Sequence, residues 1–422
     1  MKRSLEQWLD YQLKTHPQTI AMGLDRIRAV AGALGLEKPG ALVLTVGGTN
    51  GKGSTVAFAE SIALAAGLRV GAFTSPHLLR YNERVRVNGA DASAAVLVEA
   101  FERIELARDG VPLTYFEFGT LAALLVFQQA GLDLAILEVG LGGSQDAVNI
   151  IDADACIITT VDLDHQEYLG NDRETIGADK AGIMRPGKPC VLGERDPPSS
   201  VLRHAYRIGA IAIRAQADYL VERQRTRWTW REPGYEISLP LPAMSAPAQV
   251  DNAAAAIASL RALPLDLPER ALVEGVRGAR ASGRLQVVAQ RPEVVVDVAH
   301  NPQAAEQLAA WLRATPRTTR AVFSALRDKD LGAIVPAFKG LVEHWYIAGI
   351  ADAGTRGMTS AELALRLEPL LPPATVSRFA TLAEALHAAR VASREDERVL
   401  VFGSFHTAAA ALQASVGESD RL

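Results

Sequence analysis

A glycine-rich segment, Thr45–Thr55, follows a short apolar run and opens a helical pattern. This order of strand, loop and helix is the context that a phosphate-binding loop requires. Glycines let the backbone curl around phosphate oxygens, and the N-terminus of the helix adds partial positive charge. Lys52 can reach the outer phosphates, and the hydroxyl of Ser54 or Thr55 can contact Mg²⁺. The segment therefore predicts an α/β fold with a nucleotide at the end of a strand.

The match to the standard pattern of phosphate loops is imperfect. Val46 stands where the first glycine is usual, and Gly53 stands where Ser or Thr is usual. Strand, loop, lysine and helix nevertheless follow one another in the required order. We therefore interpret the segment as an ATP site rather than as a glycine-rich turn with an exposed lysine.

The chain before residue 283 alternates short apolar runs with helical patterns, which is typical of a parallel sheet covered on both faces. The expected strands are 42–46, 70–73, 134–139, 155–161 and 190–192, and the expected helices are 54–66, 94–107, 116–129, 173–184 and 252–263. Between about 211 and 242 the pattern changes. Trp228 and Trp230, two positions apart, predict a hairpin with one buried face there.

A second alternating series follows, with expected strands at 294–298, 321–325, 345–348, 376–379 and 399–402. We therefore expect two α/β domains. Residues 1–283 would form a P-loop-type domain with a mostly parallel sheet, and residues 284–422 a smaller Rossmann-like domain. The segment 281–292 is the expected hinge between them.

Composition narrows the class of protein. The 422 residues carry 44 Lys and Arg against 48 Asp and Glu, a formal net charge of -4. This balance argues against general binding to nucleic acid or to an anionic membrane, which needs a positive surplus. Cys156 and Cys190 lie in apolar runs, so we expect buried thiols rather than a disulfide framework. No apolar run is long enough for a membrane span, and a cytoplasmic protein is expected.

Polar side chains stand at the ends of several expected strands. Ser75 follows one strand, Glu138 ends another, and His165 follows a third. Ligands of open parallel sheets bind beyond the carboxyl ends of the strands. A hydroxyl, a carboxylate and an imidazole there could hold Mg²⁺ beside nucleotide phosphates. Each residue alone also fits a structural role, and Lys180 by itself indicates a solvent-exposed lysine on a helix.

Taken together, these motifs resemble those of a known family. The resemblance rests on the phosphate loop, Ser75–His77, Glu138–Gly143, Asp164 and His165, Lys180–Gly182 and Asp297–Pro302. It extends from about Leu5 to His406 and identifies the chain as similar to the bifunctional dihydrofolate synthase/folylpolyglutamate synthase family of the Mur ligase superfamily.

The resemblance implies an ATP-dependent ligase that adds L-glutamate to a pteroate or folate carboxylate through an acyl phosphate. Such a ligase converts dihydropteroate to dihydrofolate and extends reduced folates with further glutamates. ATP and Mg²⁺, the latter in two sites, are the implied cofactors. The implied partners are these small molecules alone, with no nucleic acid or membrane, and a monomer is implied.

The resemblance also implies roles for individual residues. ATP contacts are implied for Thr49, Asn50, Gly51, Lys52, Gly53, Ser54, Asn252, Arg284 and Asp297. Magnesium ligands are implied at Ser75, Glu138 and His165, and pteroate or folate contacts at Gly23, Leu24, Thr114, Tyr115, Phe116, Glu117, Gln145 and Asp146. Catalytic roles are implied for Lys52, His165, Lys180, Asp297 and His300. Lys180 would be carbamylated to N6-carboxylysine, which replaces its interpretation as an exposed lysine.

Some positions depart from the family pattern. Ser144 and Val148 stand where arginine and threonine are usual, and Asp179 stands where glutamate is usual. Two alternatives therefore stay open: a related Mur-type ligase for a different carboxylate acceptor, and a non-catalytic nucleotide-dependent switch. The Asn-Lys-x-Asp motif with which GTPases read their base is absent, which disfavours the switch. Release of ADP that depends on glutamate would separate the possibilities.

Overall fold

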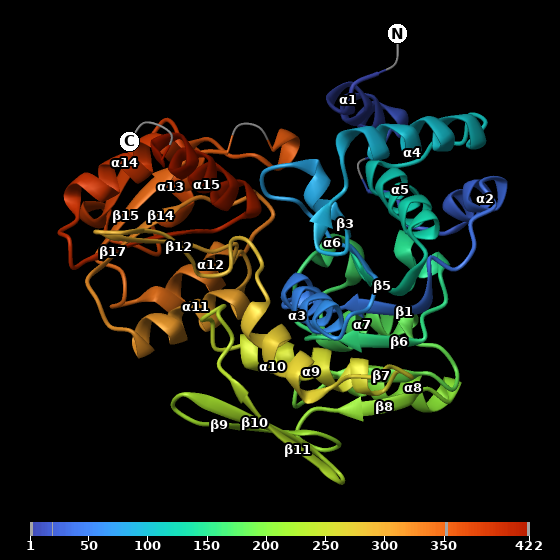
Figure 1. The fold of residues 1–422 in the computed structure, drawn as a ribbon. Helices are drawn as coiled ribbons and strands as arrows, with labels where there is room; N and C mark the ends of the chain where they lie inside the picture. Colours follow the sequence, from blue (N-terminus) through green and yellow to red (C-terminus); the bar gives the residue numbers. More distant parts are fainter. Residues whose placement is uncertain (1–2, 19, 351–352, 420–422) are drawn as a thin grey trace. The chain divides into compact units, whose positions relative to one another are not determined.

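The computed structural model describes residues 3–18, 20–350 and 353–419 (Figure 1). The chain divides into two compact units. The first comprises Met1–Ala243 with Gln249–Arg280, and the second comprises Met244–Ala248 with Ala281–Leu422. The expected boundary after residue 283 lies close to this division. The membership of the short segment 244–248 in the second unit was not foreseen.

The first unit contains an eight-stranded sheet in the order β4-β3-β2-β5-β1-β6-β7-β8. Its strands are β1 (Gly40–Gly47), β2 (Val70–Phe73), β3 (Val85–Val87), β4 (Ala90–Asp91), β5 (Leu132–Glu138), β6 (Ala155–Ile158), β7 (Pro189–Leu192) and β8 (Ile211–Arg214). The six strands from β2 to β8 in this order run parallel. Only β3 and β4, at one edge, are antiparallel. The expected mostly parallel sheet is confirmed.

Helices lie on both faces of this sheet (Figure 1). The helices of the first unit are α1 (Leu5–Thr15), α2 (Asp25–Ala33), α3 (Lys52–Ala65), α4 (Ala94–Ala107), α5 (Tyr115–Ala130), α6 (Gln166–Leu169), α7 (Arg173–Lys180), α8 (Ser199–Ile208), α9 (Gln249–Arg261) and α10 (Glu269–Gly278). The helix expected over 173–184 ends at Lys180 and continues as a 3₁₀ turn, Ala181–Ile183. Further 3₁₀ turns in the chain span Tyr81–Arg84, Ala147–Ile150, Val335–Phe338, Gly354–Arg356 and Pro373–Thr375.

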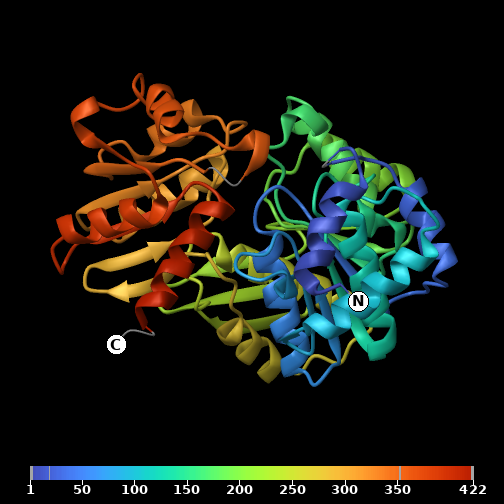
Figure 2. The same cartoon turned by 90° about the horizontal axis from the view of Figure 1, so that it is seen from above.

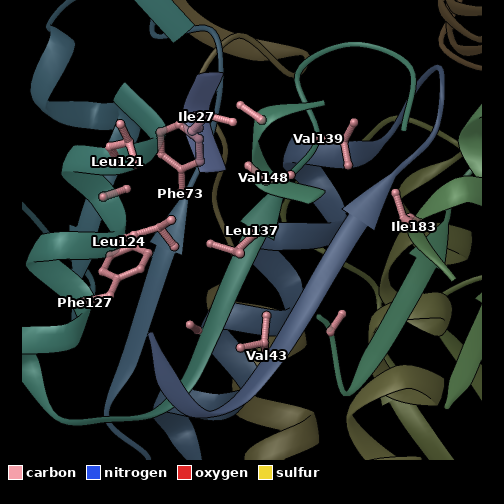
Figure 3. Packing of buried hydrophobic residues seen from close by; sticks show 14 of the residues in the cluster. Ile27, Val43, Phe73, Leu121, Leu124, Phe127, Leu137, Val139, Val148 and Ile183 are labelled. Atoms are coloured by element: carbon pink, nitrogen blue, oxygen red, sulfur yellow. The ribbon is translucent and has the colours of Figure 1, made fainter. Parts of the chain in front are cut away.

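One core of the first unit lies between the sheet and α5. Phe73 and Leu137 on the sheet meet Leu121, Leu124 and Phe127 on the helix, as Figure 3 shows. All five side chains are buried, which explains why β5 and α5 consist of nearly continuous apolar runs. The helix starts with a capping box in which Thr114 and Glu117 satisfy each other's backbone N–H groups.

The tryptophan pair forms the expected hairpin. It belongs to a separate three-stranded antiparallel sheet of β9 (Leu220–Arg223), β10 (Arg227–Glu232) and β11 (Tyr235–Pro240). Trp228 and Trp230 are both fully buried. The segment from residue 211 was wrongly grouped with this hairpin, because β8 pairs with β7 at the edge of the large sheet. Cys156 and Cys190 stand opposite each other on β6 and β7 as free, buried thiols.

The second unit contains a six-stranded sheet in the order β12-β13-β17-β14-β15-β16. Its strands are β12 (Gln286–Gln290), β13 (Glu293–Val296), β14 (Thr319–Phe323), β15 (His344–Ala348), β16 (Val376–Phe379) and β17 (Arg398–Phe402). Its helices are α11 (Pro302–Ala314), α12 (Leu331–Ile334), α13 (Ser360–Leu367), α14 (Leu382–Ala392) and α15 (Phe405–Ser419). Helices α11 and α12 lie on one face of this sheet and α14 and α15 on the other (Figures 1 and 2).

The expected hinge at 281–292 is wrong at residues 286–290, which form a strand. Residues Gln286–Gln290 form β12, which pairs antiparallel with β13 and so belongs to the sheet of the second unit. Val287 and Val288 favour a strand, and Val295 of the neighbouring strand pairs with Val287.

Across the described residues, no helix combines the length and apolar character needed to cross a membrane.

Candidate active site

The phosphate loop joins the end of β1 at Gly47 to the start of α3 at Lys52. The Lys52 ammonium donates hydrogen bonds to the carbonyl oxygens of Gly48, at 3.0 Å, and Thr49, at 3.1 Å, so the loop curls around this side chain. Gly48 and Gly51 adopt φ angles of +136° and +86°, which other residues rarely adopt. The expected phosphate loop is therefore present in its local geometry.

The two residues after Gly48 donate their backbone N–H groups to the segment that follows β6. Thr49 N–H donates to the carbonyl oxygen of Thr160 at 2.7 Å, and Asn50 N–H donates to the Thr160 hydroxyl at 3.1 Å. The Thr49 hydroxyl accepts from the N–H of Asp162 at 3.0 Å. The segment after β6 therefore holds the backbone of the phosphate loop at these two positions.

The first turn of α9 lies against the start of α3. A Cβ atom at Gly51 would lie 2.5 Å from Oδ1 of Asn252, so this asparagine is at the loop as expected. Gln249 donates to the Ser54 hydroxyl at 3.3 Å, and Asn252 donates to Gln249 at 3.2 Å. Sequence reasoning missed Gln249, although its place one turn before Asn252 was a usable signal.

Two of the three expected magnesium ligands are in direct contact. The backbone N–H of Ser75 donates to the Glu138 carboxylate at 3.0 Å. The two residues meet because β2 and β5 are neighbours, Ser75 follows β2 and Glu138 ends β5. Glu138 is 4% exposed. His165 follows β6 in a left-handed conformation, with φ at 51°, and caps α6. The neighbouring Asp164 is close enough to Lys180 for its negative charge to oppose the lowering of the Lys180 pKa by burial.

The Glu138 carboxylate and the neighbouring Ser75 fit Mg²⁺ rather than a metal ion whose ligands all come from the protein. Within residues 3–18, 20–350 and 353–419, no three His, Cys, Asp or Glu side chains form a group that could hold a metal ion. Mg²⁺ usually takes one or two carboxylates and completes its shell with water and phosphate oxygens. One buried carboxylate beside a serine, next to a phosphate loop, matches that donor set.

Lys180 is buried, which contradicts its interpretation as a solvent-exposed helix residue. The side chain is 4% exposed, and its ammonium donates to the carbonyl oxygen of Gly48 at 3.1 Å. Burial and then the positive charge of Lys52 lower the pKa of Lys180 to about 7. The structure thus brings Lys52 and Lys180 to one carbonyl of the phosphate loop.

The segments expected to hold the acceptor substrate meet around the start of α5. Arg26, shortly after Gly23 and Leu24, forms an ion pair with the Glu117 carboxylate at 3.2 Å. The Phe116 ring packs against Gly140, where a Cβ atom would lie 2.7 Å from it.

Tyr115 lies beside the Tyr81 ring, with the two centroids 5.7 Å apart. Gln145 is exposed, whereas Asp146 is buried. The Asp146 carboxylate accepts N–H groups of Gly140, Leu141 and Val148, and burial raises its pKa to about 6. Asp146 thus shapes the loop after β5.

A second group of expected site residues lies in the second unit. The Asp297 carboxylate accepts the backbone N–H groups of Leu285, at 2.9 Å, and Ala299, at 2.8 Å. Burial raises the pKa of Asp297, while the nearby Arg284 opposes that shift. The His300 Nδ1 donates to the carbonyl oxygen of Val298 at 2.8 Å.

The Phe405 ring, at the start of α15, lies against two members of this group. The centroids of Phe405 and His300 are 5.9 Å apart, and the Arg284 guanidinium lies 5.6 Å from the Phe405 centroid. Arg284, Asp297 and His300 therefore lie together in the second unit, whereas the other expected site residues belong to the first unit.

Comparisons with known proteins identify relatives along nearly the whole chain. The Mur ligase middle domain matches residues 46–260, and the Mur ligase, glutamate ligase domain matches residues 283–405. The dihydrofolate synthase/folylpolyglutamate synthase of Escherichia coli K12 is 44% identical over 96% of this chain and 94% of its own length.

Two solved structures show the same fold. Escherichia coli FolC in complex with DHPP and ADP has a TM-score of 0.93 at 42% identity and covers 100% of this chain and 99% of its own. A bifunctional folylpolyglutamate synthase/dihydrofolate synthase with Mn, AMPPNP and L-glutamate bound has a TM-score of 0.90 at 42% identity, covering 98% of each chain. The expected combination of two α/β domains is therefore a known architecture.

Proposed function

Because the chain belongs to the dihydrofolate synthase/folylpolyglutamate synthase family of Mur ligases, we propose that it joins L-glutamate to a pteroate or folate carboxylate at the expense of ATP. Relatives bound to ADP, AMPPNP, Mn and L-glutamate support ATP and a divalent metal as its cofactors. The observation that carries the proposal is the phosphate loop, where Lys52 and the buried Lys180 converge on Gly48 O.

The reaction needs charge neutralisation above all. The acceptor carboxylate attacks the γ-phosphorus of ATP, which gives an acyl phosphate and ADP. The amine of L-glutamate then attacks the acyl carbon, and phosphate leaves. Both partners of the first step are anions, so Lys52 and the N-terminus of α3 stabilise the charge on the phosphates. Ser75, Glu138 and His165 would hold Mg²⁺, which supplies further positive charge at the phosphates when bound.

Lys180 has the properties required of a carbamylated lysine. A carbamate forms when a neutral amine adds to CO₂ and loses a proton, and a pKa of about 7 leaves much of this amine neutral near neutral pH. The carbamate would then be an anion beside the Lys52 cation. We therefore assign N6-carboxylysine to Lys180 as part of the proposal.

His300 is the better candidate for the base that takes a proton from the glutamate amine. Its Nδ1 donates to Val298 O, so Nε2 is the nitrogen able to accept a proton in the neutral ring. Both oxygens of Asp297 already accept backbone N–H groups. We propose that Asp297 and Arg284 contact the nucleotide.

The acceptor needs a direct test, because Ser144 and Val148 change the polarity of the loop after β5. ADP release would be measured with dihydropteroate, a reduced folate or an unrelated carboxylate, each with and without L-glutamate. We expect release with both pterin acceptors, and only when glutamate is present. Activity confined to an unrelated carboxylate would favour the alternative Mur-type ligase, and release without glutamate dependence would favour a nucleotide switch.

We further propose that the protein is a monomer and that it is cytoplasmic. Its partners would be small molecules alone. The formal charge of -4 and the two free thiols support this setting. Light scattering coupled to size-exclusion chromatography should give the mass of a single chain, 45.1 kDa. A stable dimer at assay concentration would contradict the expected monomer.

A further inference from the structure

The loop after β5 and the end of α7 pack main chain to main chain. A Cβ atom at Gly143 would lie 2.8 Å from Cα of Lys180, and one at Gly182 would lie 2.6 Å from Cα of Ser144. A Cβ atom at Gly142 would overlap the Asp179 carboxylate. Glycine at these three positions therefore allows a contact that no larger residue permits.

Hydrogen bonds fasten this contact at both of its ends. At one end, Ser144 N–H donates to Asp179 O at 3.0 Å, and the Ser144 hydroxyl donates to Oδ1 of Asp179. At the other end, the Asn149 amide donates to Ser144 O at 3.0 Å and to Gly182 O at 3.1 Å. Arg185 donates to Oδ1 of Asn149 at 2.9 Å. We call these contacts of 142–149 with 179–185 the clasp.

Lys180, an expected active-site residue, lies within the clasp. Lys180 directly follows Asp179, so its backbone is held in the clasp while its ammonium reaches Gly48 O at 3.1 Å. Ser144 directly precedes Gln145 and Asp146, two of the expected acceptor contacts. A shift of the Ser144–Asp179 contact would therefore displace Lys180 and the acceptor loop together.

We propose that Ser144 and Asp179 are a positioning pair that sets Lys180 against the phosphate loop and aligns the acceptor loop with it. This inference rests on the proposed ligase function. The two residues lie 35 positions apart in the sequence, yet their side chains are hydrogen-bonded directly to each other. Their contact therefore joins the loop after β5 to the end of α7.

The kinetic test compares Ser144→Ala, Asp179→Asn and the double variant with Ser200→Ala. Ser200, on α8, is the matched control because its hydroxyl also donates to α7, at Glu174 O over 2.7 Å, outside the clasp. Loss of a hydrogen bond to a charged group should raise KM for the pterin acceptor or lower kcat by roughly 10-fold, with KM for ATP changed less than about 2-fold. The double variant should be no worse than the poorer single variant, because both remove one contact.

A second readout does not depend on turnover. In CO₂-free buffer, where Lys180 is an unmodified amine rather than a carbamate, an amine-acylating reagent with mass-spectrometric detection reports how often Lys180 becomes accessible. Ser144→Ala leaves all charges in place, and it should label Lys180 faster than wild type and Ser200→Ala by roughly 10-fold. Unchanged labelling, additive losses in the double variant, or an equal rise in KM for ATP and for the acceptor would overturn the inference.

The outcome also separates this inference from the proposed function. If wild type releases ADP in a glutamate-dependent way and the variants match it, only the positioning pair is wrong. If wild type shows no such release, the proposed function fails, and the labelling of Lys180 still decides whether the clasp holds it.

Discussion

Two lysines donate to the same carbonyl oxygen at the centre of the phosphate loop. Lys52 lies 3.0 Å and Lys180 3.1 Å from Gly48 O. Two cations so close repel each other, and the pKa of the buried Lys180 falls to about 7 as a result of burial and this repulsion. The arrangement becomes favourable when anions arrive, whether nucleotide phosphates or a carbamate on Lys180. The pair thus favours an anionic ligand at this loop.

Replacing Lys52 should abolish most of the activity. We expect Lys52→Ala to lower kcat for glutamate-dependent ADP release by about 10² to 10³, the usual cost of losing one preorganised charge stabiliser. Lys188→Ala is the control, because that side chain is 48% exposed and pairs with Asp154 at the surface. Near-full activity of Lys52→Ala would contradict the proposed role.

The buried Lys180 should make stability depend on pH. Its pKa is about 7 in the folded chain and 10.5 ordinarily, so between these values the unfolded chain binds more protons than the folded chain. Its stability contribution is therefore present above about 10.5 and is lost as pH falls toward about 7. Relative to Lys180→Met, wild type should gain up to about 1.4 kcal/mol per pH unit across this window.

Urea denaturation of both proteins in CO₂-free buffer, at about pH 7 and about pH 9.5, measures this difference. Lys188→Met, at an exposed position, controls for the loss of a lysine. A difference between wild type and Lys180→Met that does not change with pH would contradict the burial of a neutral amine.

At the scale of elements, the phosphate loop is tied to the segment that follows β6. The Thr159 hydroxyl donates to Asn50 O at 2.6 Å, and Thr49 exchanges hydrogen bonds with Asp162 through its hydroxyl. A few residues later the same segment reaches His165. Movement of the phosphate loop should therefore also move the expected magnesium ligand.

Gly48→Ala tests this connection. The residue has φ at +136°, and a Cβ atom would overlap the Thr159 hydroxyl, so the substitution forces the loop away from its support. ADP affinity, measured by calorimetry, should fall by at least about 10-fold, since such strain costs roughly 1–3 kcal/mol before any clash is added.

Gly67→Ala is the matched control for this substitution. It has φ at +85° with nothing within 4 Å, so it carries the backbone strain alone and should bind ADP like wild type. Equal affinity of the two variants would contradict the account of the loop.

Many of the helices and strands were predictable from the sequence. The β2 and α4 boundaries agree with the expectation, because apolar runs and capping residues are local signals. The end of β6 at Ile158 was missed, since Thr159 and Thr160 continue the pattern of a strand while their hydroxyls serve the phosphate loop. The antiparallel β12 was also missed, because its partner strand decides its role.

The site was less predictable than the fold. The phosphate loop, Ser75 and Glu138 could be inferred from strand ends, where neighbouring strands bring their final residues together. The burial of Lys180 could not, because it depends on the glycine contacts of a loop about 35 residues earlier. Pattern within one helix does not report what packs against it.

At the scale of the whole molecule, each of the two units has buried apolar residues of its own. One core of the first unit lies around β5 and α5, and a core of the second unit joins α11, β14 and β17. The expected residues are divided accordingly, with the phosphate loop in the first unit and Arg284, Asp297 and His300 in the second. The proposed reaction therefore requires both units, although each has the core of an independent domain.

A fragment of residues 1–280 should separate binding from catalysis. It retains the first unit complete, with 244–248 as a linker. We expect a cooperative unfolding transition and weak ADP binding, with no glutamate-dependent turnover, because Arg284, Asp297 and His300 are missing. Calorimetry and the ADP-release assay give these two results, and full activity of the fragment would exclude a role for the second unit.

The most direct test of the central claim follows the oxygen atoms of the acceptor. Dihydropteroate with ¹⁸O in its carboxylate would be incubated with ATP, Mg²⁺ and L-glutamate, and the inorganic phosphate analysed by mass spectrometry. Attack of the carboxylate on ATP and release of phosphate from the acyl carbon transfer a single ¹⁸O atom to phosphate in each turnover. We predict that transfer, and phosphate free of ¹⁸O would contradict a ligase that works through an acyl phosphate.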